Sequence, residues 1–138
     1  MLYVFFKFIC EWKYHRIRDI IKTCLAIKDL LKPEWWVLEN PVGRLPTLVP
    51  ELGKAKMWFH PCDYGDAYTK KTALWGRFNM PIKNFVEPEF VEFVSKKGEK
   101  KRMSKIHWEA FRLPIQERMQ VRSITPQGFA KAFYEANK

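Results

Sequence analysis

The sequence predicts an α/β fold. Three observations support this prediction: an amphipathic helix, an apolar run typical of a buried strand, and two short strand-like segments further along the chain. With 138 residues, of which 47% are hydrophobic and 16% aromatic, the chain is long enough to bury a packed core. We therefore expect a single domain over residues 1–138, with an irregular basic insert at residues 79–122.

The first predicted helix extends from about Tyr14 to Leu31, and Pro33 ends it. Its apolar side chains follow the helical repeat and form one stripe: Ile17, Ile20, Ile21, Cys24, Leu25 and Leu31. The apolar residues 1–9 before it are too few to span a membrane, and they lack the features of a secretory signal. We expect them to form a buried element or the edge of a truncated chain, with no membrane anchor.

Strands are predicted at residues 35–38, 56–60 and 72–78. The first ends at Glu39, which enters a loop rich in proline and glycine together with Asn40. Ligands bind outside the carboxyl ends of parallel strands in α/β proteins, so this loop is the first candidate site. The connection between the second and third strands has the character of a functional loop.

The chain is strongly basic, with a formal net charge of +10 and a pI near 9.6. This charge favours a polyanionic partner, with nucleic acid first and an anionic membrane surface second. Residues 95–105 carry five lysines and one arginine against Glu99. The run is interpreted as either a solvated loop or a phosphate-contacting segment, and the nearby Trp108 and Phe111 would suit base stacking.

The three cysteines form no CxxC pair, which predicts a cytoplasmic protein without a structural disulfide: Cys10, Cys24 and Cys62. Pro61-Cys62 imitates a nucleophile motif. Asp63 would raise the pKa of that thiol, so we interpret Cys62 as incidental. No metal site is predicted, because His60, Cys62 and His107 match no common zinc spacing.

Residues 35–44 (WWVLENPVGR) and 63–76 (DYGDAYTKKTALWG) resemble, in order, two motifs of phage and bacterial DNA methylase-like proteins. These are related to the cytosine carbon-5 DNA methyltransferases of restriction–modification systems. The resemblance implies the C-terminal portion of a Rossmann-like methyltransferase fold, with a helix, a parallel strand and an antiparallel strand pair. It also implies DNA as the partner and S-adenosylmethionine as the cofactor of the complete family.

The resemblance assigns catalysis to Glu39, Asn40 and Pro41. Cytosine is a poor electrophile until a carboxylic acid hydrogen-bonds or protonates its ring nitrogen 3, and Glu39 would be that acid. Asn40 would hold the loop through side-chain to backbone bonds, and Pro41 stands where a valine is more usual. On spacing alone Glu39 could equally cap the loop. Asn40-Pro41 also echoes the adenine-type motif, but Val42 follows in place of its second proline.

The second motif implies phosphate contacts by Lys70 and Lys71, which replace the family's arginines. As isolated residues they would be ordinary solvated lysines. The whole predicted nucleic-acid surface consists of Arg44, Tyr68, Thr69, Lys70, Lys71, Lys97, Lys100, Lys101 and Arg102. A final helix is predicted with Thr125 as its cap and Pro126 as its first residue. Residues 123–130 are similar to the family's terminal motif, which gives Ser123 and Thr125 a weak link to the cofactor.

Two features of the family are missing from the sequence. A glycine-rich cofactor turn is absent, because all six glycines are isolated, and no Pro-Cys nucleophile precedes the predicted helix. We therefore expect a truncated DNA methyltransferase-like protein, inactive alone and binding no cofactor unless a missing N-terminal half or a second chain completes it. The alternative is a non-catalytic, basic nucleic-acid-binding or accessory protein.

Overall fold

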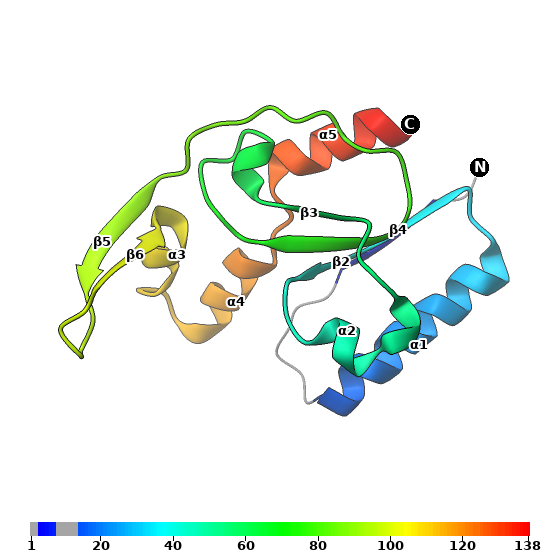
Figure 1. Cartoon of the computed structure of the whole chain (residues 1–138), viewed down its shortest axis with the longest axis horizontal. Helices are drawn as coiled ribbons and strands as arrows, with labels where there is room; N and C mark the ends of the chain where they lie inside the picture. The colour runs from blue at the N-terminus through cyan, green and yellow to red at the C-terminus, as the bar shows by residue number, and fades with distance from the viewer. Residues whose placement is uncertain (1–2, 8–13) are drawn as a thin grey trace. The chain divides into compact units, whose positions relative to one another are not determined.

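The computed structural model describes residues 3–7 and 14–138 (Figure 1). The sequence predicted one domain, and the contacts group the chain into two compact units. We call residues 1–59, 71–80 and 137 the sheet unit, and residues 60–70, 81–136 and 138 the hairpin unit. Each unit is considered by itself below.

The sheet unit contains a four-stranded sheet in the order β1-β2-β4-β3. Its elements are β1 (Tyr3–Lys7), α1 (Tyr14–Leu31), β2 (Trp35–Pro41), α2 (Leu45–Leu48), the 3-10 turn η1 (Pro50–Leu52), β3 (Met57–Phe59) and β4 (Thr72–Arg77). Strand β1 pairs with β2 in parallel, whereas β4 runs antiparallel to both β2 and β3. The mixed α/β character predicted from the sequence is confirmed.

The predicted helix and the three predicted strands are confirmed, with one correction to β2. This strand was expected to end at Glu39, but it continues through Asn40 to Pro41. The reason is its long register with β4, in which Asn40 faces Ala73 and Pro41 faces Thr72. The predicted catalytic residues therefore belong to a strand and not to a loop.

The core of the sheet unit lies between the sheet and helices α1 and α2, which cover the same face (Figure 1). Its fully buried side chains are Ile21, Leu38, Leu45, Val49, Ala73 and Trp75. Burying a valine, leucine or isoleucine side chain stabilises a fold by about 1.5–3 kcal/mol. The Trp75 indole also donates a hydrogen bond to the Gly53 carbonyl oxygen at 3.1 Å, so its polar edge is satisfied.

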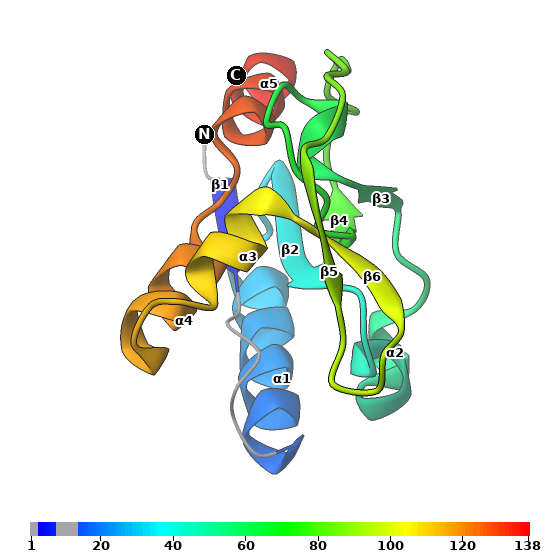
Figure 2. The same cartoon turned by 90° about the vertical axis from the view of Figure 1, so that its left-hand side faces the viewer.

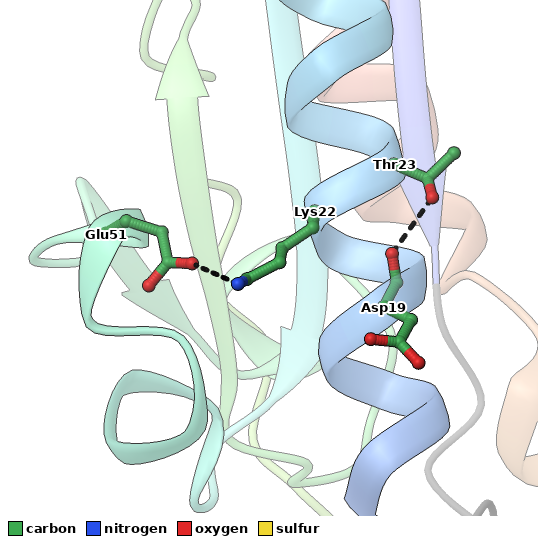
Figure 3. A network of polar contacts seen from close by, with 4 residues as sticks. All are labelled: Asp19, Lys22, Thr23 and Glu51. Carbon is green, nitrogen blue, oxygen red and sulfur yellow. Dashed lines mark hydrogen bonds and ion pairs between the residues drawn. The ribbon is translucent and has the colours of Figure 1, made fainter.

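Figure 3 shows two polar contacts made by residues of α1. Lys22 Nζ lies 3.6 Å from Glu51 Oε1 of η1, and the Thr23 hydroxyl donates to the Asp19 carbonyl oxygen at 2.9 Å. Nearly half of each charged side chain is exposed, 46% for Lys22 and 45% for Glu51. Exposed ion pairs of this kind add little stability, so apolar packing holds α1 in place.

The hairpin unit contains two strands and three helices (Figure 2). Its elements are the 3-10 turn η2 (Pro61–Asp63), β5 (Phe90–Val94), β6 (Lys100–Ser104), α3 (Lys105–Ala110), α4 (Ile115–Ser123) and α5 (Gln127–Asn137), whose last residue groups with the sheet unit. The prediction of an irregular insert at residues 79–122 is therefore wrong. Alternating side chains in residues 90–94 and a turn at Gly98, with φ of 78°, form an antiparallel hairpin there.

Helix α5 begins differently from the prediction. Pro126, with ψ of 131°, is the cap residue and not the first helical residue, and it has no side-chain acceptor. The carboxylate of Asp66 caps the start of the helix instead. Its Oδ2 accepts a hydrogen bond from the Gly128 N–H at 2.9 Å. A Cβ at Gly128 would lie 1.8 Å from the Tyr64 carbonyl oxygen, so only glycine allows this approach. The next residue, Phe129, is fully buried against the edge of the Tyr64 ring.

Gly76 makes a similar close approach in the sheet unit. Its φ is +138°, and a Cβ at this position would lie 2.1 Å from the Trp36 carbonyl oxygen of β2. We expect Gly76→Ala to lower the free energy of unfolding by about 3 kcal/mol, because β4 would have to move away from β2. Urea unfolding followed by tryptophan fluorescence measures this change. Gly43→Ala is the control, since its nearest neighbour would lie 3.8 Å away; equal losses in the two variants would contradict the prediction.

Candidate functional site

The Glu39 side chain is buried. Glu39 lies on β2 between Lys7 of β1 and Leu74 of β4, and it is 1% exposed. Leu74 is fully buried beside it. Burial of a carboxyl group costs free energy unless the group is paired or hydrogen-bonded.

Asn40 and Pro41 are joined by a side-chain to backbone contact. Asn40 Nδ2 donates to the Pro41 carbonyl oxygen at 2.7 Å, which is the type of bond expected for this amide. The following Val42 N–H donates to the Lys71 carbonyl oxygen at 3.0 Å and extends the pairing toward β4. Arg44 is exposed and starts α2, since its carbonyl oxygen accepts the N–H groups of residues 47 and 48. These predicted residues all lie in the sheet unit.

Tyr68 and Thr69 lie in the hairpin unit, where they contact the start of α3. The Thr69 N–H donates to Ser104 Oγ at 3.0 Å, and the two hydroxyl oxygens are 2.7 Å apart. The Tyr68 ring meets the His107 ring edge-on, with centroids 5.9 Å apart. The functional loop predicted between two strands is thus attached to the base of the hairpin.

The two motif lysines have different environments. Lys70 Nζ donates to the Arg122 carbonyl oxygen in the last turn of α4 at 2.7 Å, where a cation also offsets the negative end of the helix dipole. Lys71 is exposed and belongs to the sheet unit. A role for Lys70 in holding α4 therefore explains its position without a phosphate, whereas the Lys71 side chain makes no such contact with the residues that the structure describes.

The remaining predicted cations all lie on the hairpin and are exposed: Lys97, Lys100, Lys101 and Arg102. The register places Lys100 opposite Val94 and Arg102 opposite Glu92. The Arg102 guanidinium also lies over the Phe90 ring, 4.6 Å from its centroid. Lys101 is engaged by Glu99 at 3.0 Å.

Trp108 and Phe111, the aromatic residues near the basic run at residues 95–105, have different environments. Trp108 packs on Phe93 with ring centroids 4.9 Å apart and supports the inner side of the hairpin, so it is not the exposed stacking platform that was expected. Phe111 is 56% exposed, and the Arg118 guanidinium lies over its ring at 4.9 Å. Only Phe111 of this pair presents an open aromatic surface.

The described glycines have structural positions of their own. Gly76 and Gly128 serve close backbone contacts, whereas Gly53, Gly65 and Gly98 occupy turns with positive φ. None of them forms the glycine-rich turn after a first strand that an S-adenosylmethionine site needs. Ser123, one of the weakly predicted cofactor residues, donates to the Gln120 carbonyl oxygen at 2.7 Å. Thr125, the other, precedes α5 and is half-buried.

Cys62 has the environment of an unreactive thiol. It is 5% exposed, and burial, followed by the charge of Asp63, raises its pKa, as the sequence predicted. Burial and Asp63 also raise the pKa of the neighbouring Tyr64 to about 12. Within residues 3–7 and 14–138, no group of three or more His, Cys, Asp or Glu side chains is arranged to hold a metal ion. Cys10 lies outside the described residues.

Three residues around the Tyr68–Lys70 segment were not predicted: Ser104, His107 and Arg122. Ser104 is 35 residues from Thr69, and Arg122 is 52 residues from Lys70. Local patterns in a sequence do not report contacts over such separations. The basic run that contains Arg102 was the only nearby signal.

The different environments of Lys70 and Lys71 can be tested by measuring the stability of single variants. We expect Lys70→Ala to lower the free energy of unfolding by about 0.5–1 kcal/mol, because the C-terminus of α4 loses a bound cation. Lys71→Ala removes the same charge from an exposed position and serves as the control, with a change within about 0.5 kcal/mol. Thermal denaturation of both variants measures the difference. A loss for Lys70→Ala no larger than that for Lys71→Ala would contradict a stabilising role of the Lys70 contact.

The chain matches no protein-family model, and no curated protein or solved structure is significantly similar to it. No helix in the described part of the chain is long and apolar enough to cross a membrane. The resemblance to cytosine carbon-5 DNA methyltransferases therefore rests on two short motifs, around Glu39 and around Tyr64, and on a weaker match at residues 123–130.

Proposed function

We propose that this chain binds DNA through the outer face of the β5–β6 hairpin. The observation that supports this most is the concentration of exposed cations on a two-stranded antiparallel ribbon: residues 90–104 carry five basic and two acidic side chains. A ribbon of two strands fits the major groove of B-form DNA. The net charge of +10 supplies attraction to phosphates over the whole chain.

The two faces of the hairpin differ in a way that suits this role. Because side chains alternate along a strand, Val91, Phe93 and Met103 share the inner face, and all three are partly buried. Lys100 and Arg102 share the outer face with the exposed Phe90, Glu92 and Val94, whereas the exposed Lys101 lies opposite Phe93. The planar guanidinium of Arg102, stacked on the Phe90 ring, keeps its fork of N–H donors in a fixed orientation.

Most basic side chains of the hairpin are not engaged in ion pairs with described carboxylates. In the part of the chain that the structure describes, Lys101 pairs with Glu99 and Lys105 with Glu89. Lys97, Lys100 and Arg102 form no ion pair with a described carboxylate, so phosphates would meet them without displacing a protein partner. Each phosphate neutralised releases condensed counterions, which makes the binding dependent on salt.

Charge removal from the hairpin tests this function. The triple variant Lys97→Ala, Lys100→Ala and Arg102→Ala should bind duplex DNA about tenfold more weakly or worse, with a shallower dependence on salt. Fluorescence anisotropy at several salt concentrations measures both quantities.

The control removes three exposed charges from other places, by Arg18→Ala, Lys54→Ala and Lys131→Ala. It should keep most of the affinity, because only the long-range field changes. Equal losses in the two triple variants would assign binding to net charge alone. Wild-type protein that fails to bind at low salt would end the proposal.

A second candidate function is cytosine methylation of the kind that the motifs imply. It is favoured by the position of Glu39, a buried carboxyl group next to an amide that fixes the adjoining backbone. Glu39 would donate to ring nitrogen 3 of an extruded cytosine, so that a thiolate could add at carbon 6. Since Glu39 is 1% exposed, a base reaches it only when the groups covering it move. The cofactor turn and an activated thiolate would come from another polypeptide.

Glu39→Gln tests this second candidate. With a partner polypeptide that carries the cofactor turn and a Pro-Cys nucleophile, we expect the variant to lose about a hundredfold or more of the methyl-transfer rate, because glutamine delivers no proton. Incorporation of labelled methyl groups into DNA measures the rate. DNA affinity should stay unchanged and serves as the control. A rate that is the same with glutamine would reduce Glu39 to a structural residue.

A further inference from the structure

The indole of Trp58 has surroundings unlike those of the other tryptophans described in the sheet unit. Trp35 and Trp75 each donate the ring N–H to a backbone carbonyl oxygen, and a lysine ammonium lies over the ring of Trp36 at 5.3 Å. The Trp58 side chain is 53% exposed and forms no hydrogen bond, ring contact or cation–π contact with a residue that the structure describes. The first three tryptophans are thus tied to the fold by specific contacts, and Trp58 is not.

Strand β3 carries Trp58 at one edge of the four-stranded sheet, next to β4 (Figure 2). The register places Trp58 opposite Ala73, so the two side chains point to the same face of the sheet. An alanine side chain is a single methyl group and covers little of an indole. The exposure of Trp58 and its place on an edge strand therefore make the ring accessible to a flat molecule from solution.

A cation lies beside Trp58 on the same face of the sheet. Lys71 directly precedes β4, two residues before Ala73, and its carbonyl oxygen accepts the Val42 N–H at 3.0 Å, which extends the pairing with β2. Lys71 is thus a diagonal neighbour of Trp58. Such neighbours lie about 7–8 Å apart, within reach of aromatic and long side chains. Lys71 is exposed and forms no ion pair with a described carboxylate.

An open indole with a cation beside it matches the two parts of a nucleotide. Every base has a flat π face that stacks on an aromatic side chain, and its phosphate, joined to it through one sugar, carries a negative charge. The net charge of +10 favours an anionic ligand over a neutral one. The bases of a duplex are already stacked on one another, so an unpaired base is the form that fits.

We propose that Trp58 stacks on an unpaired base of DNA and that Lys71 binds a phosphate of the same strand. The identity of the ligand as DNA rests on the proposed function. The inference adds a second contact, on the sheet unit, that distinguishes unpaired from paired bases. Stacking of this kind depends little on sequence, because each of the bases offers a π face.

The test compares an oligothymidylate of about six nucleotides with an abasic strand of the same length and charge. Fluorescence anisotropy at low salt measures the affinity of the full chain for each strand. We expect the thymidine strand to bind about tenfold more tightly, because stacking of one base contributes an effect of this size. Trp58→Ala should remove the difference, and Trp58→Phe should keep part of it. Equal affinities for the two strands in the wild-type protein overturn the inference.

Two further variants complete this comparison. Phe85→Ala is the matched control, since Phe85 is an aromatic residue of similar exposure, 62%, and it should keep the preference for the thymidine strand. Lys71→Ala should weaken the binding of both strands by the same factor, because both carry phosphates. A preference that survives Trp58→Ala overturns the stacking role of Trp58, and unchanged affinities in Lys71→Ala overturn the phosphate contact.

Duplex DNA separates this inference from the proposed function. Trp58→Ala should keep the duplex affinity, whereas the triple variant Lys97→Ala, Lys100→Ala and Arg102→Ala should lose it and keep the ratio between the thymidine and abasic strands. A triple variant with unchanged duplex affinity and an intact ratio overturns the proposed function and leaves the stacking site in place. Duplex binding that depends on the hairpin, together with equal affinities for the two single strands, overturns the stacking site alone.

Discussion

Each of the two units depends on one contact in which two backbones approach more closely than a side chain would permit. In the sheet unit, Gly76 brings β4 against the Trp36 carbonyl oxygen of β2. In the hairpin unit, Gly128 brings the start of α5 against the Tyr64 carbonyl oxygen and within reach of Asp66. The first contact allows β2 and β4 to pair along their full length, and the second places Phe129 in the core.

The basic residues discussed above fall into two groups, one with internal contacts and one exposed to solvent. Lys70 and Lys105 make internal contacts, with a helix carbonyl and with Glu89. Lys97, Lys100 and Arg102 remain exposed to solvent. A high net charge alone favours loose association with any polyanion, and the proposed binding through the hairpin would give that association an orientation.

Local patterns were sufficient to predict the elements whose periodicity is strong. The stripe of α1 and the apolar run of β2 identify a helix and a strand directly, because each pattern records one buried face. The hairpin at residues 90–104 was missed, because the lysines of β6 have the composition of a solvated loop. Its strand character comes from pairing with Phe90, Val91 and their neighbours.

The candidate site was also predictable only in part, because local sequence patterns do not record contacts between distant residues. Glu39 and Asn40 stand out because they are polar residues that follow an apolar run. That their strand continues to Pro41 depends on β4, more than 30 residues away, and local patterns do not record that pairing. The carboxylate that caps α5 likewise comes from Asp66, 62 residues before Gly128, and so the nearest polar residue, Thr125, was chosen wrongly.

The register of β3 and β4 has a consequence for how the chain is divided in sequence. Phe59 and Thr72 are partners in this pairing, so the chain leaves the sheet unit and returns to it at neighbouring points. Residues 60–70 therefore have the topology of an insertion into a hairpin, whose ends are held together by the pairing of β3 with β4. A short turn of the kind that joins two antiparallel strands would span the same gap. The sheet unit is in this respect a continuous piece of architecture encoded by a discontinuous stretch of sequence.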